Sequence, residues 1–127
     1  MKRPIYREIA SIIQAIENCR KAGNAGWLTK HEERLEELVS LLPSGSGIDN
    51  GTKLDIDSCK PGKLVFTLGY HHMNDVGMYD GWTEHVLTVT PSFDGIELRF
   101  SGRNRNDIKD YLHDTYYFAL TQEIELK

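Results

Sequence analysis

Residues 5–42 have the sequence IYREIASIIQAIENCRKAGNAGWLTKHEERLEELVSLL, in which apolar side chains recur at helical spacing. In the first half of this stretch they fall on one face of a helix: Ile5, Ile9, Ile12, Ile13, Ile16 and Cys19. Pro4 suits the first helical turn, because an N–H there has no intrahelical partner to lose, and Gly23 suits the C-terminal cap. The stretch therefore predicts a helix that ends just before Gly23.

The second half predicts another helix, from about Trp27 to Leu41. Its inward-facing side chains lie three or four residues apart: Leu28, His31, Leu35, Leu38 and Leu42. Pro43 ends this helix. We therefore expect a helical hairpin over residues 1–42, in which the leucine face packs on the isoleucine face.

The pattern changes after a loop rich in serine and glycine at residues 43–51. Beyond it, apolar and polar residues alternate, which is typical of strands with one buried face. The positions expected on that face are Leu54, Ile56, Leu64, Phe66, Leu68, Tyr70, Thr83, His85, Leu87, Val89, Ile96, Leu98 and Phe100. The sequence PSFDG at residues 91–95 predicts a hairpin turn. Together these features indicate about four antiparallel strands over residues 52–102.

A last helix is expected over residues 104–122, with Asn104 as its N-cap. Its apolar side chains form a broad stripe suited to covering a sheet: Ile108, Tyr111, Leu112, Thr115, Tyr116, Ala119 and Leu120. The predicted fold class is therefore α+β: an N-terminal helical hairpin, an antiparallel β-meander and a C-terminal helix packed on the sheet. We expect residues 1–127 to form a single domain.

The 127 residues carry 15 Lys and Arg against 19 Asp and Glu, a formal net charge of −4. This balance weighs against binding to duplex nucleic acid. No stretch approaches the roughly 20 apolar residues that span a bilayer, and the start of the chain is amphipathic rather than a signal peptide. Cys19 and Cys59 form no CxxC pattern, and we expect Cys19 to be a small buried hydrophobe. These features favour a cytoplasmic protein.

The densest group of polar and aromatic side chains lies at residues 70–85, YHHMNDVGMYDGWTEH, between two expected strands. Tyrosine and tryptophan offer large contact areas at little cost in conformational entropy. We therefore expect a ligand-binding or partner-binding surface there, formed by His71, His72, Asn74, Asp75, Tyr79, Asp80 and Trp82. The alternative is an ordered β-connection whose polar side chains only support local turns.

Imidazole and carboxylate groups also suit a metal ion. Adjacent histidines on an extended strand point to opposite faces, so a feasible set takes one of His71 and His72, with Asp75 or Asp80 and with His85 from the neighbouring strand. As the alternative interpretation we take His72, Asp75 and His85. The spacing matches no established zinc signature, and our first interpretation includes no metal or other cofactor. The set defines an alternative, a metal-dependent hydrolase or phosphodiesterase that uses a metal-activated water.

Two further segments suit an anion. Residues 44–52 are rich in glycine, but they follow a helix and precede a strand, which is the reverse of the order in a P-loop. Arg103 and Arg105 precede the last helix, where two guanidinium groups suit a small phosphorylated ligand or an acidic partner surface. The alternative is that these arginines are solvated or pair with Asp107 and Asp110.

In three segments the chain resembles a family of small uncharacterised proteins carried by bacteriophages, prophages and other mobile elements. The segments are LPSGSGID at 42–49, HHMND at 71–75 with YDGWT at 79–83, and GRNRNDIKDYL at 102–112. The resemblance assigns no catalytic residue. It implies an accessory protein of a bacterial host cell, a class that often inhibits a host enzyme or defence system or sequesters its signalling molecule.

The polar and aromatic residues predict a binding module without enzymatic activity. The resemblance implies that it acts on a host protein, as an inhibitor, or on a small anionic signal. Neither a membrane nor duplex nucleic acid is an expected partner. Spare apolar surface that includes Trp27 would also suit a homodimer.

Overall fold

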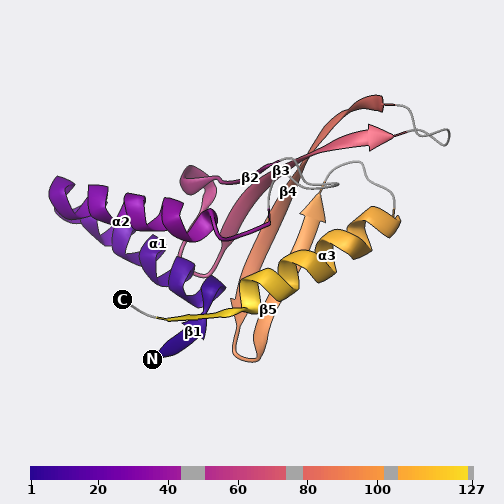
Figure 1. The fold of residues 1–127 in the computed structure, drawn as a ribbon. Helices are drawn as coiled ribbons and strands as arrows, with labels where there is room; N and C mark the ends of the chain where they lie inside the picture. The colour runs from indigo at the N-terminus through magenta and orange to yellow at the C-terminus, as the bar shows by residue number, and fades with distance from the viewer. Residues whose placement is uncertain (44–50, 74–78, 102–105, 126–127) are drawn as a thin grey trace.

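The computed structural model describes residues 1–43, 51–73, 79–101 and 106–125. It confirms the α+β class: two helices precede a four-stranded antiparallel sheet, and a third helix packs on that sheet (Figure 1). The three helices lie on the same side of the sheet, and side chains of the opposite face are exposed to solvent, among them Val86, Thr90 and Arg99.

The predicted helical hairpin is present as α1 (Ile5–Ala22) and α2 (Ala25–Val39). Gly23 ends α1 in the left-handed conformation, with φ of 70°, which glycine adopts without the strain of a Cβ atom. α2 begins two residues earlier than predicted, because the Asn24 side chain accepts a hydrogen bond from the Trp27 N–H at 3.3 Å and caps the helix.

Two details of the hairpin differ from the sequence prediction. α2 ends at Val39, so the last turn of the predicted helix is irregular, although Leu42 still reaches the core. Cys19 is half-buried rather than buried; it lies in the last turn of α1, next to the turn at Gly23 and Asn24 that connects α1 to α2. Both cysteines are free thiols.

The sheet has the order β2-β3-β4-β5, and each strand runs antiparallel to its neighbours. Its strands are β2 (Gly51–Leu54), β3 (Leu64–Met73), β4 (Tyr79–Ser92) and β5 (Gly95–Ser101). The expected alternation from Leu54 to Ile56 stops at Leu54, because a 3-10 helix, η1 (Ile56–Ser58), follows. The Ser58 hydroxyl donates to the Asp55 carboxylate at 2.7 Å and stabilises this turn.

α3 (Asn106–Thr121) covers part of the sheet, and its predicted cap Asn104 lies outside the described residues. Tyr111 belongs to the predicted inward stripe but is half-exposed, because the stripe is wider than the surface that the sheet offers. After α3, β6 (Glu123–Glu125) pairs with β1 (Lys2–Pro4), a two-stranded contact that the sequence pattern did not predict.

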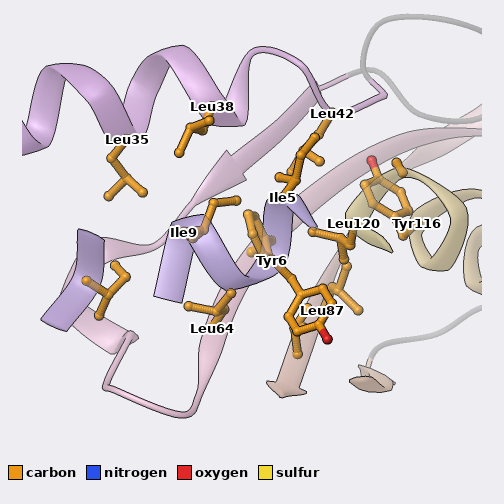
Figure 2. Packing of buried hydrophobic residues seen from close by; sticks show 14 of the residues in the cluster. Ile5, Tyr6, Ile9, Leu35, Leu38, Leu42, Leu64, Leu87, Tyr116 and Leu120 are labelled. Carbon is orange, nitrogen blue, oxygen red and sulfur yellow. The ribbon is translucent and has the colours of Figure 1, made fainter. Parts of the chain in front are cut away.

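All three helices and the sheet contribute to one hydrophobic core (Figure 2). The side chains that meet in it include Ile5 and Ile9 of α1, Leu35 and Leu38 of α2, Leu64 and Leu87 of the sheet, and Tyr116 and Leu120 of α3. Each is almost completely buried. Because burial of one such side chain contributes about 1.5–3 kcal/mol, this core holds α3 and the helical hairpin against the same sheet face.

Candidate functional site

Five of the recognition residues predicted from the sequence lie on a two-stranded extension of the sheet: His71, His72, Tyr79, Asp80 and Trp82. Among the described residues, β2 pairs with β3 as far as Gly69, and β5 pairs with β4 as far as Val86. Beyond these points β3 and β4 pair with each other, and the hairpin projects past the neighbouring strands (Figure 1). We call residues 70–73 and 79–85 the β3–β4 arm. The predicted connection is therefore mostly strand.

The register of the arm brings some of the predicted residues together along the backbone. His71 lies opposite Trp82, His72 opposite Gly81, and Tyr79 opposite Met73, with a register shift between His72 and Met73. Asp80 lies beside Tyr79 on β4. Asn74 and Asp75 lie outside the described residues, and so do Arg103, Arg105 and residues 44–50 of the glycine-rich loop.

The same register separates the two histidines of the alternative metal set. His72 lies opposite Gly81, and His85 follows Gly81 by four positions, which corresponds to about 13 Å of strand. That separation weighs against a single ion bound to both. Among the described residues, no group of three or more His, Cys, Asp and Glu side chains could hold a metal ion. The third member, Asp75, lies outside these residues, and the set stays a prediction.

A concave apolar surface that the sequence pattern did not predict lies between the end of the helical hairpin and α3. Its cavity has a volume of about 610 Å³ and is lined by Leu41, Pro43, Tyr111, Asp114, Thr115 and Phe118, with Ala119 and Gln122. We call it the α3 groove. Three of its apolar side chains face solvent: Leu41 is 57% exposed, Tyr111 51% and Phe118 75%.

Hydrogen bonds beneath the groove fix its two walls relative to each other. The Pro43 carbonyl oxygen accepts a hydrogen bond from the Tyr116 hydroxyl at 3.0 Å and another from the Thr52 hydroxyl at 2.9 Å. The two hydroxyl groups also contact each other. Because Tyr116 is fully buried on α3 and Thr52 lies on β2, these bonds join the end of the hairpin to the sheet and to α3.

The groove contains one carboxylate in its lining, that of Asp114, and the segment that carries most of its lining residues is acidic. Residues 110–125 contain the four carboxylates of Asp110, Asp114, Glu123 and Glu125, and no lysine or arginine. The terminal amine of Met1 pairs with Glu125 at 3.0 Å. Within the described part of the chain, Asp110, Asp114 and Glu123 pair with no lysine or arginine. The groove thus combines exposed apolar side chains with the carboxylate of Asp114, which lies 3.5 Å from His113 Nδ1 and, among the described residues, has no lysine or arginine partner.

Comparison of the chain with protein-family models, curated proteins and solved structures finds no match. The resemblance to phage and mobile-element proteins therefore stays a prediction. Nor does any helix of the described segments have the length and apolar character needed to cross a membrane.

Phe118 is the residue of the groove whose position in the sequence could have indicated an exposed apolar surface. It lies outside the inward stripe of α3, so an apolar side chain there had no partner within the predicted fold. Trp27, the residue expected at a homodimer interface, is also exposed; its ring stacks on His31 with centroids 5.9 Å apart and lies 4.8 Å from the Lys30 amine. Intramolecular contacts thus cover part of the Trp27 ring, and the homodimer stays a prediction.

Proposed function

We propose that this protein is a binding module that recognises another protein through the α3 groove. The observation that carries the proposal is the gathering of Leu41, Tyr111 and Phe118 around one concave surface. Single exposed apolar side chains are common on protein surfaces, whereas a group of them around a groove marks an interaction site. Buried aromatic anchors also supply much of the binding energy at protein interfaces.

Charge complementarity defines the chemistry of the partner. Asp114 lines a groove whose wall is otherwise largely apolar, and Asp110 and Glu123 are next in sequence to its lining residues Tyr111 and Gln122. A segment that places an apolar side chain on Phe118 and lysine or arginine side chains near these carboxylates satisfies both features, and an acidic segment would be repelled. The proposed partner is therefore a protein with an amphipathic, basic segment.

The resemblance to phage and mobile-element proteins makes a bacterial host protein the expected partner, and inhibition of that protein the expected consequence. The β3–β4 arm supplies a second surface for the same role. A two-stranded hairpin has little stability of its own in water, so contact with a partner would stabilise this arm. His71 and Trp82, which lie opposite each other on this arm, are expected to contribute to binding of the partner.

The test uses a fluorescein-labelled 18-residue amphipathic helical peptide of leucine and lysine, and an otherwise identical peptide of leucine and glutamate. Fluorescence anisotropy with the full chain should give saturable binding of the basic peptide only. Phe118→Ser should weaken this binding at least about tenfold, as expected for an aromatic anchor. Asp114→Lys should weaken it about threefold, because one exposed charge contributes little.

Phe93→Ser is the matched control, because Phe93 is an exposed phenylalanine at the tip of the β4–β5 hairpin and does not line the groove. This variant should bind the basic peptide as the unchanged chain does. Equal losses for Phe93→Ser and Phe118→Ser, or equal binding of the acidic peptide, would contradict the proposal. A loss for Trp82→Ala with none for Phe118→Ser would transfer the binding role to the arm.

A further inference from the structure

A second hollow, of about 350 Å³, lies where the start of α1 meets the turn at residues 60–63 and the end of β4. Arg3, Arg7, Ser11 and Gln14 line one side of it, and Pro61 and Pro91 line the other. We call it the basic hollow. It shares no lining residue with the α3 groove, so a ligand bound in it would be independent of the proposed protein partner.

Arg7 differs from the other arginines that the structure describes. Arg20, Arg34 and Arg99 each have a carboxylate partner within 4.0 Å, and so does Arg3. Arg7 has none among the described residues. Its Nε donates to the Tyr6 hydroxyl at 3.2 Å, and its guanidinium carbon lies 5.5 Å from the Tyr6 ring centre. Both terminal nitrogens of Arg7 therefore remain available as donors beside the hollow.

Arg3 is held in place by two contacts and keeps one terminal nitrogen for a ligand. Its Nε lies 3.3 Å from a Glu8 carboxylate oxygen, and its Nη1 donates to the Ser11 hydroxyl at 3.2 Å. Within the described residues, Arg3 Nη2 has no partner. The Ser11 oxygen accepts from Arg3, so its own proton is free to donate. Two guanidinium groups and one hydroxyl thus supply donors to the same hollow.

The charge around the hollow is positive, although the chain as a whole is negative. No carboxylate among the described residues lines it, and Glu8 offsets the charge of Arg3 alone. Lys60 and Lys63 flank the turn that forms one wall, where each backbone N–H donates to the other residue's carbonyl oxygen at 2.9 Å. The guanidinium groups of Arg3 and Arg7 would therefore attract an anion into the hollow.

We propose that the basic hollow binds a phosphomonoester. Guanidinium groups match the geometry of phosphate oxygens and form short, charge-assisted hydrogen bonds with them, and two such groups suit a dianion. Ala10, Pro61 and Pro91 supply apolar wall for the organic group of the ester. The volume lies at the lower end of the range found for small-molecule sites, which favours a compact organic phosphate over a polymer.

Titration of the ¹⁵N-labelled full chain with phenyl phosphate, followed by NMR, tests this site. Shifts should saturate and concentrate in residues 3–14 and 60–63. Arg7→Gln should weaken binding about tenfold, since it removes charged hydrogen bonds, and Arg7→Lys should weaken it less. Arg99→Gln, a change at an exposed arginine outside the hollow, is the matched control and should leave the affinity unchanged.

The spectrum of each variant also reports whether it is folded. Saturable binding of inorganic phosphate that depends on Arg7 would support the same site. Equal affinity of the unchanged chain and Arg7→Gln for phenyl phosphate would overturn the proposal. So would equal shifts with phenol, because they would arise from the apolar wall without the phosphate.

Discussion

The hydroxyl of Tyr116 donates a hydrogen bond of 3.0 Å to the carbonyl oxygen of Pro43, a residue 73 positions earlier in the chain. Tyr116 is fully buried on α3, and Pro43 follows the helical hairpin. Thr52 donates to the same carbonyl oxygen, so this group receives hydrogen bonds from two parts of the fold. Hydrogen bonds to the Pro43 carbonyl oxygen therefore connect the end of the hairpin, β2 and α3 beneath the α3 groove.

Tyr116→Phe removes the hydrogen bond from the Tyr116 hydroxyl to the Pro43 carbonyl oxygen and keeps the aromatic ring in the core. We expect the free energy of unfolding to fall by about 1 kcal/mol, the usual net contribution of one hydrogen bond. Urea unfolding followed by circular dichroism measures this change. Tyr117→Phe is the control, because the neighbouring Tyr117 is exposed and its hydroxyl should contribute little. A similar loss for both variants would show that the buried bond has no special role.

Leu38→Ala and Leu41→Ala separate the core from the groove. Leu38 is fully buried between the helices and the sheet, so its truncation should destabilise the protein by about 2–5 kcal/mol. Leu41 is mostly exposed, and its truncation should change the free energy of unfolding by less than about 0.5 kcal/mol. Chemical denaturation checks both values.

In peptide binding the order of the two variants should be reversed, with the larger effect from Leu41→Ala. Leu41→Ala should weaken binding of the basic peptide to the α3 groove severalfold, while folded Leu38→Ala should retain it. If Leu41→Ala destabilised the chain as much as Leu38→Ala does, Leu41 would belong to the core and not to an accessible surface.

The sequence was sufficient to predict those elements whose buried faces follow a simple period. Ile9 in α1 and Leu38 in α2 each belong to a row of apolar residues at helical spacing, and Phe66 and Leu68 belong to the alternating pattern of β3. Each pattern predicts a buried face, and the structure confirms that these residues are buried. The three-residue strands β1 and β6 are too short to show such a pattern, so their contact could not be predicted in this way. It depends on where α3 ends, because the Ile5 N–H donates to the Gln122 carbonyl oxygen at 3.0 Å and brings the two short strands together.

The α3 groove was harder to predict for a similar reason. Periodicity assigned Tyr111 to the inward face of α3, but the width of the surface beneath a helix is a property of the tertiary packing and cannot be obtained from the helix alone. The basic hollow likewise joins residues that are far apart in sequence, Arg7 of α1 and Pro91 of β4. The predicted role of the β3–β4 arm stays a prediction.

Gly23→Ala and Gly26→Ala should change stability in opposite directions. Gly23 has a φ of 70°, where a Cβ atom costs about 1–2 kcal/mol even though no other atom lies within 4 Å of its ideal Cβ position. Gly26 lies in the first turn of α2 without a positive φ, and alanine there should stabilise the chain by about 0.4–1 kcal/mol. Thermal unfolding of the two variants tests the signs, and a stabilised Gly23→Ala would contradict the cap geometry.

Cys59 should make the stability of the protein depend on pH in the alkaline range. Burial raises the pKa of the Cys59 thiol above its ordinary value of 9.0; the hydrogen bond with the Val65 backbone opposes this shift, and the charge of Asp55 adds to it. The folded chain therefore keeps this proton at pH values at which the unfolded chain has lost it. The contribution of Cys59 to the free energy of unfolding is then complete below pH 9.0 and is lost as the pH rises through the folded pKa.

Urea midpoints of the unchanged chain and of Cys59→Ala, measured between neutral pH and about pH 10.5, isolate this contribution, since lysine and tyrosine residues titrate in both proteins. The midpoint of the unchanged chain should fall more steeply above pH 9.0 than that of the variant, and the two curves should run parallel below it. Parallel curves over the whole range would mean that the thiol titrates alike in the folded and unfolded chains. Cys59 would then be accessible to water, contrary to its position against β3, where its sulfur accepts a hydrogen bond from the Val65 N–H at 3.2 Å.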